Sequence, residues 1–123
     1  MDGLQQIFKQ IRDLISRYSP PMVVKKDQAD YYDLWSVKEV VIAGRKKKEV
    51  FFAGAIIQKG YVGFYFMPIY VDENMKKVFP TELLALLKGK SCFHIRRNDT
   101  VIMSQIEKAL KAGFNIYRNK GWV

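Results

Sequence analysis

Cys92 and His94 are the only cysteine and the only histidine of the chain, and they stand two residues apart. Residues at this spacing on a β-strand point to the same face. A thiolate beside an imidazole suits half of a zinc site, or a nucleophile with its base. However, a zinc site needs about four ligands, and strand neighbours of this kind lie roughly 6.5–7 Å apart, which is long for a nucleophile and its base. We therefore favour a buried cysteine and a structural histidine, and we identify no catalytic residue.

The carboxylates that could hold a metal recur every three residues, as Asp27, Asp30 and Asp33. Unpaired carboxylates in a flexible segment bind a hard cation weakly, and more often such residues form loops and turns. These three residues are the only metal candidates, and no cofactor is expected. The sequence has no phosphate-binding glycine loop, no HExxH and no GxSxG, so it favours a binding protein over an enzyme.

A run of four cations occupies Arg45–Lys48 in a chain whose formal net charge is +9. Such a run could grip phosphates, and Trp35, Tyr61 and Tyr65 could offer stacking surfaces for bases. A charged turn also keeps a chain soluble and discourages pairing at a sheet edge. Because the remaining charge is dispersed, we favour the solubility role and rank nucleic acid behind a small ligand or a protein as a partner.

Length and composition predict one domain over residues 1–123, since half of the residues are hydrophobic and a chain of this size can bury a single core. One cysteine cannot form an internal disulfide, which is typical of a cytoplasmic protein. The N-terminus lacks the apolar core of a signal peptide. No window approaches the roughly 18 apolar residues of a membrane span, so no membrane partner is expected.

Apolar residues at helical spacing predict an amphipathic helix over residues 4–18, which Ser19-Pro20-Pro21 ends. A period of two predicts strands over residues 31–37, 39–44, 48–58 and 61–71, and residues 91–96 add a fifth. A short helix is expected from Phe79 to Gly89, and Asn98-Asp99-Thr100 offers N-cap side chains to a last helix. This order predicts an α+β fold: an antiparallel five-stranded sheet with the N- and C-terminal helices packed mainly on one face, as a two-layer sandwich.

The segment Gln58-Lys59-Gly60 predicts a three-residue hairpin loop, which would pair Ile57 with Tyr61 and Ala53 with Tyr65. Alternation then gathers bulky apolar side chains on one face, and we place the helices there. The opposite face is expected to be more open, although small residues also let a helix approach closely, so the reverse arrangement stays open. The bulky face carries Phe52, Gly54, Ile56, Val62, Phe64 and Phe66, and the more open face carries Ala53, Ala55, Tyr65 and Met67.

Two stretches, KGYVGFYFMPIY and GKSCFHIRR, are followed by the closing helix and resemble the YdhG-like domains. These are small, largely uncharacterised bacterial proteins whose fold is similar to that of frataxin, and the resemblance covers nearly the whole chain. It implies a frataxin-like two-layer fold and, first among functions, an iron chaperone. Frataxins bind iron on an acidic ridge formed by the first helix and the strand edge, whereas the first helix here carries Lys9, Arg12 and Arg17.

These features predict a small binding or chaperone-like domain that uses the open sheet face for a ligand or a protein partner. Exposed aromatic and thioether groups suit an apolar ligand or a protein surface, and an arginine adds an anion contact. The alternatives are an intracellular iron chaperone of the frataxin type and a small-molecule enzyme with a pocket near His94; a homodimer is a further alternative. The candidate ligand-binding residues are Trp35, Tyr65, Met67, His94 and Arg96.

Overall fold

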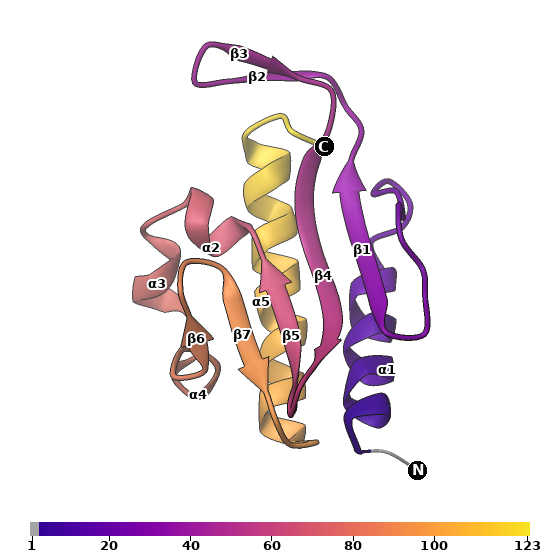
Figure 1. Cartoon of the computed structure of the whole chain (residues 1–123). Coiled ribbons are helices and arrows are strands. Elements are labelled where there is room, and N and C mark those ends of the chain that lie inside the picture. Colours follow the sequence, from indigo (N-terminus) through magenta and orange to yellow (C-terminus); the bar gives the residue numbers. More distant parts are fainter. Residues whose placement is uncertain (1–2) are drawn as a thin grey trace.

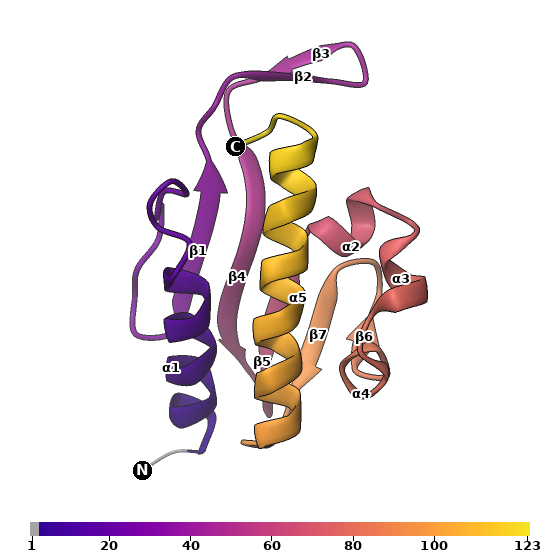
Figure 2. The same ribbon diagram turned by 180° about the vertical axis from the view of Figure 1, so that it is seen from behind.

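The computed structural model describes residues 3–123 and arranges them in two layers. One layer is a five-stranded antiparallel sheet, and the other consists of helices α1 (Gly3–Ser16) and α5 (Thr100–Asn119). Both helices lie behind the sheet in Figure 1 and in front of it in Figure 2. This arrangement confirms the predicted α+β fold, with the N- and C-terminal helices on one face. Within residues 3–123, no helix is long and apolar enough to cross a membrane.

The main sheet has the spatial order β1-β4-β5-β7-β6, and three one-turn helices lie beside its β7 and β6 side (Figure 1). Its strands are β1 (Tyr31–Ser36), β4 (Val50–Gln58), β5 (Tyr61–Phe66), β7 (Cys92–Ile95) and β6 (Leu87–Lys88). The one-turn helices are α2 (Pro68–Val71), α3 (Met75–Val78) and α4 (Thr81–Leu84). The remaining strands, β2 (Val40–Ile42) and β3 (Arg45–Lys47), pair only with each other.

Membership of the five-stranded sheet differs from the prediction, although the number of strands agrees. The strand expected over residues 39–44 leaves the sheet, because Ala43 and Gly44 both have positive φ, at 52° and 79°, and turn the chain back as a hairpin. The fifth strand is β6, which lies in a segment predicted to be helical. Helix α4 ends at Leu84, and Gly89, with φ of 74°, turns the chain from β6 into β7.

Both long helices follow their apolar stripes. Helix α5 begins where predicted, because the Asp99 carboxylate accepts hydrogen bonds from the N–H groups of Val101 and Ile102. Strand β5 is shorter than predicted, since Pro68 opens helix α2 only two residues after Phe66. The buried stripes are Ile7, Phe8, Ile11 and Ile15 in α1, and Ile102, Ile106, Ala109, Leu110, Gly113 and Tyr117 in α5.

The hairpin between β4 and β5 has a two-residue loop, so the predicted register is wrong by one residue. Gln58 pairs with Tyr61, Ala55 with Phe64, and Ala53 with Phe66. Gly60 has φ of 85° and supplies the left-handed residue that the tight loop needs. Side chains of paired residues share a face, which places Ala53 and Ala55 on the same face as the phenylalanines of β5.

A β-bulge in β4 reconciles this register with the position of Phe52. Leu34 pairs with Ala53 and Trp35 with Phe51, so Phe52 has no partner in β1. The extra residue changes the alternation, and both Phe52 and Ala53 are fully buried on the helix side. Ala53 and Ala55 were predicted on the more open face, and the bulge with the shorter loop is the physical reason that they are not.

Phe52 is the centre of the aromatic core. Its ring centroid lies 5.8 Å from that of Tyr18, 6.2 Å from Phe114 and 5.4 Å from Tyr117. The Tyr117 hydroxyl donates a hydrogen bond to the Phe51 carbonyl, next to the bulge. Phe52, Phe64 and Phe66 have no exposed surface, which confirms that the helices cover the face that carries these rings.

Residues 23–27 run along the outer edge of β1 and add backbone pairing there. Val23 and Trp35 exchange two backbone hydrogen bonds of 2.8 and 2.9 Å, and the N–H of Asp33 donates to the carbonyl of Lys26. This segment is therefore attached to the sheet edge, although it contains only isolated bridges.

Candidate functional site

The sheet face opposite α1 and α5, called the open face below, faces the viewer in Figure 1, and no helix of residues 3–123 covers it. The rings on this face are half-buried, which contrasts with the fully buried rings of the helix side. Strand pairing assigns its members, since Gly54 pairs with both Asp33 and Tyr65, and Gly63 with His94. The open face consists of Tyr31, Asp33, Trp35, Phe51, Gly54, Ile56, Gln58, Tyr61, Gly63, Tyr65, Cys92 and His94.

A cavity of about 330 Å³ lies on the open face over β1 and β4. Gly54 lies among its lining residues, where a Cβ atom would come within 3.4 Å of Phe51 Cζ and 3.0 Å of the Tyr32 carbonyl oxygen. The rings of Trp35 and Phe51 meet edge to face with centroids 5.2 Å apart. This volume is at the lower end of the range for small-molecule pockets. The lining residues are Tyr31, Asp33, Trp35, Phe51, Gly54, Ile56 and Tyr65.

Asp33 is the charged residue in this lining, and only 5% of its surface is exposed. Its Oδ1 accepts hydrogen bonds from the backbone N–H groups of Lys25 at 3.0 Å and Lys26 at 2.8 Å. No cationic side chain of residues 3–123 forms an ion pair with it, and its Oδ2 receives no hydrogen bond from these residues. The unused Oδ2 can accept a hydrogen bond from a donor that a ligand supplies.

Two other features of the cavity wall involve polar groups and aromatic rings. The indole Nε1 of Trp35 is buried and has no hydrogen-bond partner among the described residues. The ammonium groups of Lys25 and Lys26 each lie 4.5 Å from a ring centroid, over Trp35 and Tyr31 respectively. Lys25 is also paired with Glu49. These contacts show that rings of the cavity wall already attract cations through their faces.

His94 and Arg96 belong to a second group at the far end of β7. The His94 ring stacks on Tyr61 with centroids 3.8 Å apart, and the Arg96 guanidinium lies 5.4 Å from the centroid of the same Tyr61 ring. Partial burial, followed by the charges of Arg96 and Lys88, lowers the pKa of His94, so the imidazole is neutral at pH 7. A smaller cavity of about 250 Å³ is lined by Leu86, His94, Ile95, Arg96, Arg97, Asp99 and Ile102.

The five candidate residues thus fall into two groups and an outlier. Trp35 and Tyr65 share the larger open-face cavity, whereas His94 and Arg96 share the smaller one. Met67 is half-buried in the turn that leads into α2. Sequence reasoning missed Asp33 and Tyr31 as partners of Trp35, although alternation within Tyr31–Ser36 places all three on one face. It did not name Phe51 as a candidate, and it placed Gly54 and Ile56 on the helix side, because neither the shorter hairpin loop nor the bulge was foreseen.

Cys92 is half-buried on the open face beside Tyr65, with which it pairs across the strands. Burial raises the pKa of the Cys92 thiol, and this outweighs the opposite effect of a side-chain hydrogen bond to Tyr65. A raised pKa leaves little thiolate at neutral pH, and the thiolate is the reactive form. The site therefore lacks an activated nucleophile at this position.

We accordingly expect iodoacetamide to modify Cys92 slowly at pH 7.5, at least about tenfold more slowly than the same protein unfolded in guanidinium. The rate should rise only as the pH exceeds the ordinary thiol pKa. Mass spectrometry of timed, quenched samples measures both rates. Fast labelling of the folded protein would contradict the assignment of an inert thiol, if the pH at which its labelling rate is half-maximal also lay below that of the unfolded chain.

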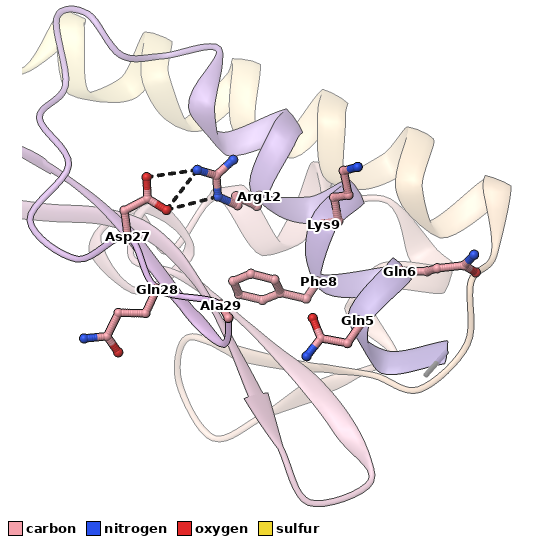
Figure 3. A pocket seen from close by; sticks show the side chains of 8 residues that line it. All are labelled: Gln5, Gln6, Phe8, Lys9, Arg12, Asp27, Gln28 and Ala29. Atoms are coloured by element: carbon pink, nitrogen blue, oxygen red, sulfur yellow. Dashed lines mark hydrogen bonds and ion pairs between the residues drawn. The ribbon is translucent and has the colours of Figure 1, made fainter. Parts of the chain in front are cut away.

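The three aspartates considered for metal binding are used in different ways. Asp27 lies at a hollow of about 570 Å³ between α1 and residues 27–29, where Arg12 binds it with Nη2 2.9 Å from both carboxylate oxygens (Figure 3). Asp33 accepts two backbone N–H groups, and Asp30 is exposed. Within residues 3–123, no group of three or more His, Cys, Asp or Glu side chains is placed to hold a metal ion.

The fold and the site define a small α+β domain with a helix-covered sheet face and an open, aromatic sheet face that contains a carboxylate. Comparison of the chain with family models, with curated proteins and with solved structures finds no match in any of the three.

Proposed function

We propose that this chain is a small binding domain of the YdhG-like kind, which holds a flat and largely apolar ligand in the open-face cavity. The observation that carries the proposal is a cavity with four aromatic rings and a buried carboxylate that lacks a cationic partner. Apolar walls with a few placed polar groups are the usual composition of a small-molecule site. The α+β layering fits the fold that the YdhG-like resemblance implies.

The carboxylate gives the proposed ligand its polarity. Asp33 Oδ2 can accept a hydrogen bond from an amine or amide N–H, and the rings of Tyr31, Trp35, Phe51 and Tyr65 favour a flat body with delocalised or positive charge. The ligand class that fits is therefore a small aromatic amine. On binding, the N–H group of the ligand would exchange its hydrogen bond with water for one with Asp33. A hydrogen bond to a charged acceptor contributes about 1.5–3 kcal/mol.

The two other functions considered from the sequence draw less support. Iron handling would use Asp27, Asp30 and Asp33, but Arg12 already binds Asp27 and backbone amides bind Asp33. An enzyme near His94 would need an acid or base partner. The carboxylate that lines this cavity, Asp99, caps helix α5. The geometry at both places supports binding or structural roles more than catalysis.

Three indole compounds with short side chains of positive, zero and negative charge test the proposal: tryptamine, indole-3-propionamide and indole-3-propionate. Chemical shifts of the Gly54 and Gly63 amides report binding at the open face. We expect tryptamine to bind about tenfold more tightly than the propionate, with the amide between them, because the amine alone brings a positive charge to the Asp33 carboxylate and the propionate brings a negative one. Asp33→Asn keeps the Oδ1 acceptor for Lys25 and Lys26 but removes the charge, and should abolish the preference.

Asp30→Asn is the matched control, because it removes the same charge from an exposed side chain three residues away and should keep the preference for tryptamine. If no compound shifts the two glycine amides at about 5 mM, equivalent to roughly −3 kcal/mol of binding, the cavity is not a site for this ligand class. Tighter binding of the propionate would refute the role of Asp33. Sedimentation velocity on the same samples separates ligand binding from a homodimer that covers the open face.

A further inference from the structure

Beyond the end of the main sheet, the hairpin of β2 and β3 projects from the body of the molecule (Figures 1 and 2). We call residues 38–48 the basic ribbon. Its base is fixed, because the Ser36 hydroxyl donates to the Trp122 carbonyl and accepts a hydrogen bond from the N–H of Lys38. Val40 is 9% exposed and anchors the first strand, whereas the turn at Ala43 and Gly44 is exposed to solvent.

The basic ribbon concentrates positive charge without local compensation. It contains five cations, namely Lys38 and the run Arg45–Lys48, against one carboxylate, Glu39. All four residues of the run are exposed, and none of them forms an ion pair with any residue of 3–123.

The pairing distributes these cations over both faces of the ribbon. Arg45 pairs with Ile42 and Lys47 with Val40, so Arg45 and Lys47 share one face. Lys46 pairs with Val41 and lies on the other face, and Lys48 follows directly after the last pair. A ribbon that enters between the two phosphate backbones of a duplex meets negative charge on both sides, and this ribbon carries cations on both of its faces.

We propose that the basic ribbon enters the major groove of double-stranded DNA and holds its phosphates. A two-stranded β-ribbon fits the B-form major groove, which is about 12 Å wide and about 8.5 Å deep. Three paired residues on each strand extend roughly 10 Å, which matches that depth. The deep, narrow major groove of RNA would exclude the ribbon. With lysine and arginine as its main polar groups, the contact is largely independent of base sequence.

Two other roles for the basic ribbon fit the geometry less well. Insertion into a membrane surface requires an apolar tip, but the turn is Ala43-Gly44 and Arg45 stands directly beside it. A purely solubilising role, which the sequence favoured for this run, does not require the cations to be held on a paired ribbon with a fixed base. The proposal is independent of the open-face cavity, so each can fail without the other.

Fluorescence polarisation with a labelled 20-base-pair DNA duplex, at several NaCl concentrations, tests the proposal. The charge variant replaces Arg45, Lys46, Lys47 and Lys48 by alanine. The matched control replaces the exposed lysines Lys59, Lys76, Lys77 and Lys108 by alanine. Both variants lower the formal charge by four, from +9 to +5. We expect the charge variant to bind at least about tenfold more weakly at 100 mM NaCl and to lose about 3–4 from the log–log salt slope.

The control should keep its affinity within about twofold, because its lysines lie away from the ribbon. Gly44→Val supplies a geometric test, since it retains every cation but places a β-branched residue at φ of 79°. We expect it to weaken duplex binding as well. Circular dichroism confirms that each variant remains folded.

Equal losses in the charge variant and the control would show that net charge alone attracts DNA, and would overturn the proposal. Unchanged binding by Gly44→Val would overturn the role of the hairpin geometry. The same oligonucleotide as a single strand, and anionic phosphatidylserine vesicles, complete the comparison. Tighter ribbon-dependent binding to either of these than to the duplex would contradict a major-groove contact.

Discussion

Replacing Phe52 by alanine is expected to lower the free energy of unfolding by about 3–5 kcal/mol, the range for truncation of a large buried aromatic ring. Phe52 has no exposed surface, and its ring contacts Tyr18 and Tyr117 as well as Phe66 across the sheet. Removal of the ring leaves a cavity that both helices line. Because typical domains are stable by only 5–15 kcal/mol, chemical denaturation should show a large decrease in the midpoint.

The adjacent residue provides a matched control for this prediction. Phe51→Ala removes the same number of atoms, but Phe51 is half-buried on the open face, where its ring contacts Trp35. The partial exposure of Phe51 in the native state predicts a cost well below that of Phe52→Ala. Equal costs for the two variants would contradict the assignment of these neighbouring phenylalanines to opposite faces of β4.

Gly113→Ala should destabilise the fold by about 1–3 kcal/mol, even though alanine is the better helix former. A Cβ at Gly113 would lie 2.5 Å from Phe66 Cζ and 2.7 Å from Pro68 Cγ, so helix α5 would have to move away from β5 and α2. Gly3→Ala in helix α1 is the control, because nothing lies within 4 Å of its Cβ position. Thermal unfolding measures both variants; if Gly113→Ala raised the melting temperature, the close approach of α5 would be refuted.

Local pattern was sufficient for those parts of the fold that depend on neighbours in the sequence. The apolar spacing of Gly3–Ser16 and the Asp99 cap of helix α5 could be read directly, because both are interactions within about one helical turn. The bulge at Phe52 could not be predicted from the local sequence, because it is defined by the pairing of β4 with β1. A period of two in one strand contains no information about an extra residue relative to its partner.

The candidate site shows the same division. Trp35 and Tyr65 were predictable as open-face residues, since each follows the alternation of an unbulged strand. The two amides that hold Asp33 come from residues 25–26, which reach it through the edge of β1, and this contact is not visible in the local sequence. The projection of the basic ribbon follows from Ala43, a residue type for which positive φ is uncommon.

The pairing of residues 23–27 along β1 has a consequence for how the protein behaves at high concentration. A free strand edge is a template on which another chain can add, and growth of that kind leads to filaments. Here Val23 uses the N–H and C=O of Trp35 on one side of the sheet, and the strand at the other side, β6, has only two residues. Both margins are thus poor starting points for polymerisation, even though the sheet presents a broad aromatic surface to solvent.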